Sequence, residues 1–443
     1  MGAATSRVSS AGAEQVREDG TIRVAVVGLG YVGLPLALEF ARGGAQVLGI
    51  DVDERKVTAV NAGHSYLLDV DADALGAAVA DGLLSATTDF NALAGTENIC
   101  ICVPTPLRKS LDPDISHIVA AVEEVAKHLR RGMLVVLEST TYPGTTEEIV
   151  LPRLEAGGLK AGVDFHLAFS PERVDPGNTR YAIRNTPKIA GGMTRACTER
   201  AVKLYQFAVD EVVPVHSPRA AEMVKLLENT FRAINIGLVN ELAMICNHLG
   251  IDIWEVIEAA KTKPFGYIPF YPGPGLGGHC IPIDPLYLSW KLRTVNYTAR
   301  FIELAATINS NMPHYVVEQV TDVLNTDRKS VNGSRILLLG VAYKPDVADV
   351  RESPALDILA LLRRKGAVVA YSDPYVPELD LLGERYASHD LAHGVKDFDL
   401  VLVTTNHSAF DMDAILASAQ VVYDTRNATA GRKVPEGCRV VRL

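Results

Sequence analysis

The middle of the chain contains side chains whose types and spacing suit the stabilisation of negative charge on oxygen. Lys225 and Asn229 are four residues apart in a helical pattern, so their ammonium and amide groups share one helix face. This pair fits an oxygen that gains negative charge during alcohol oxidation or acyl transfer, although a solvated lysine beside a polar neighbour has the same spacing. Cys280 follows a glycine pair in a loop, and a thiolate there can attack an aldehyde carbon, although an isolated loop cysteine is more often inert. Asp284 is a candidate base or a turn residue.

Other polar side chains follow expected strands, and ligands bind at the carboxyl ends of the strands in open parallel sheets. Glu172 comes directly after one apolar run and Thr140 after another. The Glu172 carboxylate can position or deprotonate a water molecule, or it can pair with a nearby arginine. Lys344 and Arg351 lie near a second glycine turn. Two cations there indicate phosphate contacts or, as the alternative, a surface network of ion pairs.

The motif Gly28-Leu29-Gly30-Tyr31-Val32-Gly33 lies between an apolar run and a helical pattern. In such a motif the first glycine permits a tight turn, the second lets the backbone approach a pyrophosphate, and the third lets helix and strand pack closely. The N-terminus of the helix then faces the phosphates. Asp51 ends the next apolar run, where a carboxylate accepts a hydrogen bond from a ribose 2′-hydroxyl, so NAD is favoured over NADP. Lys56 still leaves room for NADP, and the alternative is a glycine turn without a cofactor, with Asp51 as a helix cap.

Apolar runs alternate with helical patterns on both sides of a helical middle. Residues 22–30 form an apolar run that is typical of a strand buried on both faces of a parallel sheet. This alternation predicts an α/β fold with two Rossmann-like, doubly wound domains joined by a helical central domain. We expect a disordered leader at 1–20, a Rossmann domain at 21–213, the central domain with the cysteine loop at 214–328, and the second Rossmann-like domain at 329–443.

The composition is that of a globular protein with several domains. The chain has 443 residues, of which 48% are apolar and 22% charged, and a formal net charge of −10. This length exceeds what one hydrophobic core usually supports, and the negative charge disfavours nucleic-acid binding. Six cysteines without a CxxC pair predict neither a disulfide framework nor a metal site. Because we find no apolar run of about 18 residues and no secretory signal, we expect a cytoplasmic protein without a membrane partner.

The order of the motifs resembles the UDP-glucose/GDP-mannose dehydrogenase family from residue 22 to the C-terminus. The matching segments are GLGYVGLP, CVPTP, STTYPG, SPER, KLLENTFR, PGPGLGGHCIPIDP and AYKPDVADVRESP. The resemblance implies a four-electron oxidation of the C6 hydroxyl of a nucleotide sugar to a carboxylate, with two NAD⁺ used in turn. A cysteine captures the intermediate aldehyde as a thiohemiacetal, the same site oxidises it again to a thioester, and water hydrolyses the thioester. The resemblance also implies a UDP-sugar site on the C-terminal domain and a homodimer formed by the central helices.

The resemblance assigns roles to the residues that match the family motifs. The implied catalytic set is Cys280, Lys225, Asn229, Asp284, Glu172 and Thr140. Cys280 is the nucleophile, Lys225 and Asn229 stabilise oxyanions, Asp284 orients a base water, and Glu172 and Thr140 handle the hydrolytic water. Together with the glycine motif, the expected NAD contacts are Gly28, Gly30, Tyr31, Val32, Gly33, Asp51, Lys56, Thr105, Thr140 and Arg351. The expected substrate contacts are Glu172, Arg173, Lys225, Asn229, Lys263, Phe270, Tyr271, Gly273, Gly277 and Lys344, with Lys263 reaching across the dimer.

Within the family, the segments KTKPFGYIPFYPG and PGPGLGGHCIPIDP most resemble the bacterial UDP-N-acetyl-D-glucosamine 6-dehydrogenases. UDP-glucose dehydrogenases commonly carry a lysine where this chain has Ile283, which disfavours UDP-glucose. We therefore expect a UDP-N-acetylhexosamine substrate, with UDP-GlcNAc the first choice and UDP-ManNAc or UDP-glucose as alternatives. A two-electron β-hydroxyacid dehydrogenase and a non-catalytic sugar-nucleotide binder are the alternatives from other classes.

Overall fold

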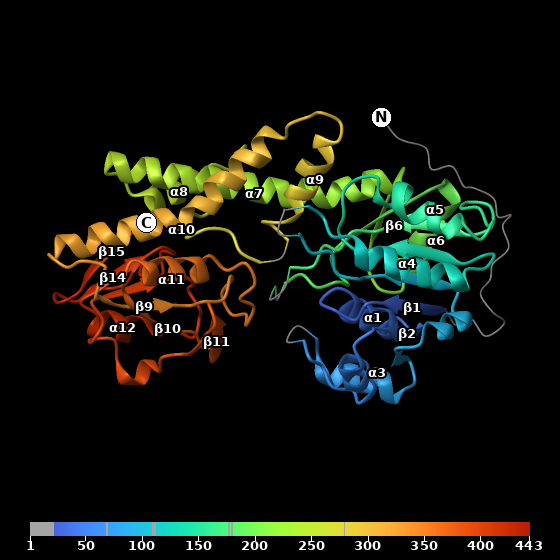
Figure 1. Ribbon diagram of the computed structural model, residues 1–443, viewed down its shortest axis with the longest axis horizontal. Coiled ribbons are helices and arrows are strands. Elements are labelled where there is room, and N and C mark those ends of the chain that lie inside the picture. The colour runs from blue at the N-terminus through green and yellow to red at the C-terminus, as the bar shows by residue number, and fades with distance from the viewer. Residues whose placement is uncertain (1–21, 68–69, 109–111, 176–177, 179, 279) are drawn as a thin grey trace. The chain divides into compact units, whose positions relative to one another are not determined.

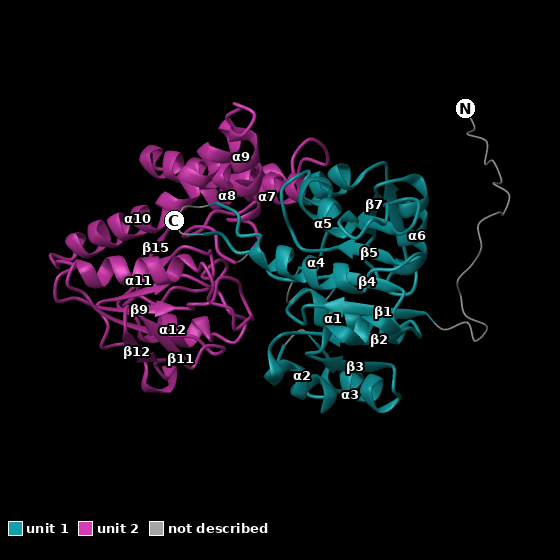
Figure 2. Ribbon diagram, turned by 45° about the vertical axis from the view of Figure 1, so that its right-hand side comes forward, with its two compact units in different colours: residues 1–225 teal, residues 226–443 magenta. Residues whose placement is uncertain are grey.

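The computed structural model describes residues 22–67, 70–108, 112–175, 178, 180–278 and 280–443. The expected leader at 1–20 and His279 of the cysteine loop lie outside the described residues. The chain forms two compact units, residues 1–225 and residues 226–443 (Figure 2). No helix in the described part of the chain has the length and apolar character needed to cross a membrane. The division into three expected domains stays a prediction.

The first unit is built on an eight-stranded sheet with the order β3-β2-β1-β4-β5-β6-β7-β8 (Figure 1). Its strands are β1 Arg23–Val27, β2 Gln46–Ile50, β3 Leu84–Thr87, β4 Asn98–Ile101, β5 Leu134–Leu137, β6 His166–Phe169, β7 Lys188–Gly192 and β8 Val212–Val215. The first six strands are parallel to their neighbours, and β7 runs antiparallel to β6. Their order, 3-2-1-4-5-6, is that of a dinucleotide-binding Rossmann sheet. The predicted doubly wound fold is therefore confirmed here.

Helices cover both faces of this sheet, which explains why its central strands are continuously apolar. They are α1 Gly33–Arg42, α2 Glu54–Asn61, α3 Ala72–Ala80, α4 Ser116–His128, α5 Leu151–Glu155 and α6 Arg195–Tyr205, with short helices η1 Phe90–Gly95 and η2 Thr146–Val150. Val24 and Val26 of β1 share one hydrophobic core with residues of α1 and α6. Ala25 and Val27 share a second core with residues of α4 and α5.

A long helix, α7 Pro218–Leu249, begins in the first unit and continues into the second. In the second unit it packs with α8 Ile253–Lys261 and α10 Arg300–Thr326, while α9 Asp284–Arg293 follows the cysteine loop. Gly237 allows a close approach of α7 and α10, because a Cβ there would lie 3.2 Å from Ala305 Cα. Asn309 of α10 accepts a 2.9 Å hydrogen bond from Asn240 Nδ2 and donates to Ala233 O at 3.0 Å. The helical middle that the sequence predicts is thus tied together by polar as well as apolar contacts.

The C-terminal sheet has the order β10-β9-β13-β14-β15, and all its strands are parallel. Its strands are β9 Arg335–Leu339, β10 Val368–Ser372, β13 Leu400–Val403, β14 Val421–Asp424 and β15 Arg439–Arg442. The remaining elements are α11 Pro354–Arg364, α12 Met412–Ser418, the short η3 Leu391–His393 and the hairpin β11 Glu378–Leu381 with β12 Glu384–Ala387. Counted from β9, the order is 2-1-3-4-5, a doubly wound arrangement with one strand fewer than the six-stranded order of the first unit.

Candidate active site

The glycine motif forms the turn between β1 and α1, and its three glycines meet three different constraints. Gly28 has φ +95°, and a Cβ there would lie 2.7 Å from Cys102 O. A Cβ on Gly33 would lie 1.8 Å from Gly28 O, so the third glycine lets the start of α1 touch the turn. A Cβ on Gly30 would meet no atom within 4 Å, and no side chain caps the N-terminus of α1. The backbone at Gly30 therefore borders open space beside a helix N-terminus, which is the arrangement that binds a phosphate.

Asp51 directly follows β2, and its carboxylate is hydrogen-bonded to the backbone of the glycine turn. Its Oδ2 accepts hydrogen bonds from Leu29 N at 2.8 Å and from Lys56 Nζ at 3.0 Å, and its Oδ1 accepts one from Asp53 N at 3.0 Å. Oδ2 thus accepts two hydrogen bonds, whereas Oδ1 accepts one and has a second lone-pair site for another donor. The ammonium of Lys56 thus pairs with Asp51, and the alternative of Asp51 as a helix cap is wrong because Asp53 caps α2.

The remaining expected residues of the first unit gather at the same edge of the sheet. Strands β1, β4, β5 and β6 are neighbours, and their carboxyl ends lead to the glycine turn, to Thr105, to Thr140 and to Glu172, respectively. Thr105 is buried and Thr140 half-buried. The order of the sheet reverses between β1 and β4, which is the point where ligands bind in such folds.

The Glu172 carboxylate is held by its own turn. Its Oε1 accepts hydrogen bonds from Arg173 N at 2.7 Å and from Val174 N at 2.5 Å. The Arg173 guanidinium, expected to contact substrate, donates to Pro187 O. The alternative prediction was that the Glu172 carboxylate pairs with an arginine side chain. Its described partners are backbone N–H groups instead.

Lys225 lies on α7 one turn after a carboxylate that sequence analysis did not single out. Glu222 accepts hydrogen bonds from Gly144 N at 2.6 Å, from Thr146 N at 2.9 Å and from Thr146 Oγ1 at 2.7 Å. Burial raises the pKa of Glu222, although these donors act in the opposite direction. Glu222 therefore fastens the start of α7, with Lys225, to the segment that follows Thr140. Lys225 itself is only 6% exposed, which does not fit a solvated lysine.

In the second unit, the cysteine loop leads directly into a pair of buried polar side chains. Asn229 Nδ2 donates to Asp284 Oδ2 at 2.5 Å, and both residues are buried. Asp284 begins α9, and its N–H donates to Cys280 O at 2.8 Å. Asp284 is therefore hydrogen-bonded both to the backbone of Cys280 and to the side chain of Asn229.

Cys280 differs from the other cysteines in exposure. All six cysteines lie in the described part of the chain, and Cys280 alone is exposed while the other five are buried. Burial raises the pKa of the Cys100 and Cys102 thiols, which lie on β4 and just after it. A buried thiol with a raised pKa is a poor nucleophile, so exposure favours Cys280 as the reactive cysteine.

The glycines before Cys280 pack against a loop of the C-terminal sheet. A Cβ on Gly277 or Gly278 would lie less than 3 Å from Tyr343, and Gly278 N donates to Arg351 O at 3.0 Å. Gly273 N donates to Asn240 Oδ1 at 3.0 Å, and a Cβ on Gly273 would require the Arg426 guanidinium to move. The glycine-rich loop thus borders the segment of Lys344 and Arg351.

Three expected substrate residues lie on the earlier part of this loop and contact residues of α7, of α8 or of the loop itself. Phe270 packs edge-on against Phe231, with ring centroids 5.7 Å apart. Tyr271 donates to Glu258 at 2.9 Å and stacks on Trp254. Lys263 is exposed, with its ammonium 5.0 Å from the centroid of the Phe265 ring. Their predicted contacts with substrate stay predictions.

Lys344 and Arg351 lie in the loop after β9. Arg351 forms a two-pronged ion pair with Asp349, with distances of 3.0 and 2.7 Å, so the ion-pair alternative applies at least in part to this residue. Close to Lys344, Asp346 adopts φ +61° and accepts hydrogen bonds from Ser408 N at 2.8 Å and Ser408 Oγ at 3.0 Å.

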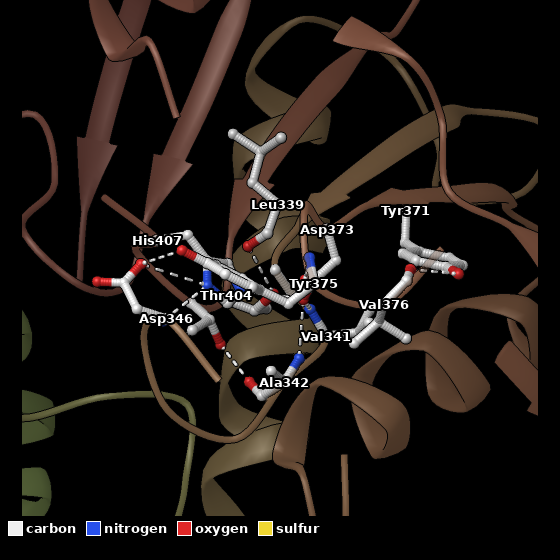
Figure 3. A network of polar contacts seen from close by, with 12 residues as sticks. Leu339, Val341, Ala342, Asp346, Tyr371, Asp373, Tyr375, Val376, Thr404 and His407 are labelled. Carbon is white, nitrogen blue, oxygen red and sulfur yellow. Dashed lines mark hydrogen bonds and ion pairs between the residues drawn. The ribbon is translucent and has the colours of Figure 1, made fainter. Parts of the chain in front are cut away.

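A buried network beneath this loop was not predicted (Figure 3). Asp373 Oδ2 accepts hydrogen bonds from Val341 N at 2.7 Å and Ala342 N at 3.0 Å, and lies 3.0 Å from His407 Nε2. His407 Nδ1 accepts from Asp346 N at 3.0 Å, so Nε2 carries the proton that it donates to Asp373. Asp373 follows β10 as Asp51 follows β2, and each binds the backbone of the preceding turn. An aspartate directly after the second strand of each sheet domain was therefore the signal in the sequence that could have identified Asp373.

Three models of one family match almost the whole chain. Residues 22–209 match the NAD binding domain, residues 219–311 the central domain, and residues 337–431 the UDP binding domain of the UDP-glucose/GDP-mannose dehydrogenase family. The chain belongs to this family. It is therefore an NAD-dependent UDP-sugar dehydrogenase, and the predicted family, fold class, enzyme class and cofactor are confirmed.

Relatives within the family carry different substrate names. The UDP-N-acetyl-D-glucosamine 6-dehydrogenase of Pseudomonas aeruginosa is 36% identical over 394 residues, which cover 88% of this chain and 91% of that protein. The NDP-N-acetyl-D-galactosaminuronic acid dehydrogenase of Ralstonia nicotianae is 34% identical, with coverage of 93% and 97%. A solved structure of the UDP-D-ManNAc dehydrogenase of Pyrococcus horikoshii has a TM-score of 0.86 and 35% identity, with coverage of 95% and 99%. The dehydrogenase fold is thus shared by proteins with different sugars.

The glycine turn of this dehydrogenase fits NAD, and Gly30→Ala tests the fit. Because a Cβ at Gly30 meets no protein atom within 4 Å, the substitution should leave the melting temperature unchanged. The methyl group occupies space that the pyrophosphate needs, so we expect NAD affinity to fall at least ~10-fold, or about 1.4 kcal/mol. Calorimetric titration with NAD measures this effect. Gly157→Ala, between α5 and β6, is the control, because its Cβ would also meet no atom within 4 Å and its φ is not positive; unchanged affinity in Gly30→Ala would place the pyrophosphate elsewhere.

Proposed function

We propose that this protein oxidises the C6 hydroxyl of a UDP-N-acetylhexosamine to a carboxylate, with UDP-GlcNAc as the first choice of substrate and UDP-GlcNAcA as the product. The observation that carries the proposal is the exposed Cys280 at the end of a glycine-rich loop, linked through Asp284 to Asn229. Membership of the family supports a UDP-sugar as the substrate and NAD as the cofactor. The thiol favours a four-electron oxidation, because a two-electron dehydrogenase needs no thiol. NAD⁺ supplies the hydride acceptor for both oxidations, held by residues of the turn at Gly28, Gly30 and Gly33 and by Asp51.

In the first oxidation the sugar hydroxyl loses its proton while negative charge develops on its oxygen. We assign the stabilisation of that charge to the Lys225 ammonium and the Asn229 amide. One N–H of Asn229 donates to Asp284, and an amide has a second N–H for the oxyanion. Asp284, as a buried carboxylate, orients the water that accepts the proton. The product of this step is the C6 aldehyde.

The second oxidation starts from an adduct on the enzyme. The Cys280 thiolate adds to the aldehyde carbon, which forms a C–S bond and turns the carbonyl oxygen into an alkoxide that is then protonated. The thiohemiacetal is an alcohol-level carbon, so the same groups can stabilise its oxygen during the second oxidation. The thioester that results is hydrolysed by a water molecule that Glu172 and Thr140 position.

The sugar is assigned by assaying NADH release with UDP-GlcNAc, UDP-ManNAc and UDP-glucose at limiting amounts. We expect two NADH per UDP-GlcNAc, a carboxylate product, and the highest kcat/KM for this substrate. A higher kcat/KM for UDP-ManNAc or UDP-glucose would transfer the assignment to that sugar. One NADH per sugar would contradict the double oxidation.

We also propose that two copies associate through an apolar stripe on α7. Leu227, Phe231, Leu238, Leu242, Ile245 and Leu249 recur at helical spacing, and each is at least 40% exposed. Phe301 and Leu304 of α10 are exposed as well. Exposed apolar side chains that follow one face of a helix favour an interface at that face.

Replacing two leucines of this stripe with glutamate tests whether the stripe forms the dimer interface. Each leucine that is buried at an interface contributes about 1.5–3 kcal/mol, so Leu238→Glu with Leu242→Glu should raise the dimer dissociation constant at least ~100-fold. Light scattering after size exclusion should then show monomers. Val163→Glu, at an 82% exposed position of the first unit, is the matched control. An unchanged dimer would place the interface on another surface.

A further inference from the structure

A buried ion pair lies below the sheet edge that carries Glu172. Lys188 Nζ, on β7, lies 2.7 Å from Glu138 Oε2, just after β5, and both side chains are buried. Tyr205 OH donates to Glu138 Oε1 at 2.5 Å, and the Lys188 ammonium lies 4.9 Å from the centroid of the Tyr205 ring. Burying two charges costs so much solvation that such a pair is weak evidence for stability. We therefore examine which neighbouring residues this ion pair holds in place.

The pair belongs to a set of contacts that tie the Glu172 turn to β7. Lys188 Nζ donates to Pro171 O at 3.4 Å, and Ser170 Oγ donates to Ile189 O at 2.7 Å. Arg173 donates to Pro187 O. Three residues of the turn are thus bonded to residues 187–189, at the start of β7 and just before it, and Lys188 is the middle one of these three.

The charges around Lys188 keep its side chain in the ammonium form. Burial lowers the pKa of Lys188, but the negative charges of Glu138 and Glu172 raise it more, so the ammonium stays charged. Burial raises the pKa of Glu138, and the charge of Glu172 adds to that rise. The charges of both carboxylates thus favour the ammonium form of Lys188, and the ion pair at 2.7 Å is with Glu138. The nearby Cys100 and Cys102 thiols are neutral, because burial raises their pKa.

We propose that Lys188 is a positioning residue for thioester hydrolysis: through its hydrogen bond to Pro171 O it holds the Glu172 turn against β7. This rests on the proposed function. In the step concerned, the water oxygen adds to the thioester carbon while Glu172 accepts one water proton. The C–S bond then breaks, its electron pair leaves with Sγ as the Cys280 thiolate, and the sugar carboxylic acid is released and ionises. Lys188 contributes to this step and to neither hydride transfer.

The test compares Lys188→Met/Glu138→Gln with Glu138→Gln alone. The double variant replaces both charges, so no buried charge is left without a partner and the fold is kept. We expect the double variant to release two NADH per active site in a first burst at the normal rate. Steady turnover should then fall about 10- to 100-fold, because a small misplacement of a catalytic group costs that much. Acid-quenched protein should carry the uronyl thioester by intact mass.

The outcomes separate the inference from the function on which it rests. Accumulated thioester in the double variant and not in Glu138→Gln supports the role of Lys188. Equal slowing of burst and steady turnover, or no adduct, overturns it. One NADH per sugar from the unmodified protein instead contradicts the proposed function. Lys203→Met, on the exposed face of α6, is the control and should behave as the unmodified protein.

Discussion

Replacing Cys280 with alanine is expected to abolish carboxylate formation while NAD binding stays intact. The thiol supplies the covalent bond that turns the aldehyde into an alcohol-level carbon, and no other cysteine of this chain is exposed. Removal of the nucleophile from a covalent enzyme costs on the order of 10⁴–10⁶ in turnover. The product is measured by mass spectrometry of the nucleotide sugar, and NAD binding by calorimetry.

The control for this variant is Cys246→Ala, because Cys246 is also in the second unit but buried in the helical core. It should retain normal turnover at a small cost in stability. Release of aldehyde by Cys280→Ala, with one NADH per sugar, would agree with the account. Carboxylate produced at the normal rate would show that the reaction runs without a thioester.

Lys225→Ala is expected to lower kcat by about 10²–10³-fold, or ~3–4 kcal/mol of transition-state stabilisation. The lysine is 6% exposed, and its turn of α7 is fastened by Glu222 to Gly144 and Thr146. Because the oxyanion develops only in the transition state, the loss should appear in kcat and kcat/KM together rather than in KM alone. Steady-state NADH release measures both constants.

An exposed lysine of the same unit provides the comparison. Lys203→Ala, on α6, should leave kcat and KM unchanged. Circular dichroism checks that the Lys225→Ala protein is folded, since its side chain is buried. Near-normal turnover in folded Lys225→Ala would make this lysine a structural residue and not part of the oxyanion site.

Local spacing made the nucleotide-binding turn predictable. The glycines of the turn and Asp51 are near one another in the sequence. Gly28 has a positive φ and Gly33 a backbone contact that leave no room for a side chain, whereas Gly30 leaves open space for a ligand. Periodicity was equally sufficient for the central strands, because strands buried on both faces are apolar throughout. Strands β3, β7 and β8 of the first sheet were not predicted, since β3 and β8 have exposed residues and β7 begins with a buried lysine.

The supporting polar network could not be predicted, because its partners are far apart in the sequence. Glu138 and Lys188 are separated by fifty residues, and Asp373 and His407 by thirty-four. A single sequence gives the types of such side chains but not which of them pair. The same limit applies to Glu222, which in the sequence is one more polar residue on a long helix.

The measurement that tests the central claim most directly is the location of the covalent intermediate. Glu172→Gln removes the group assigned to the hydrolytic water, so the enzyme should stall with the oxidised sugar attached. Peptide mass spectrometry after digestion of the quenched protein should find that mass on Cys280, together with two NADH per active site. Two NADH per sugar with Cys280 never modified would contradict the account.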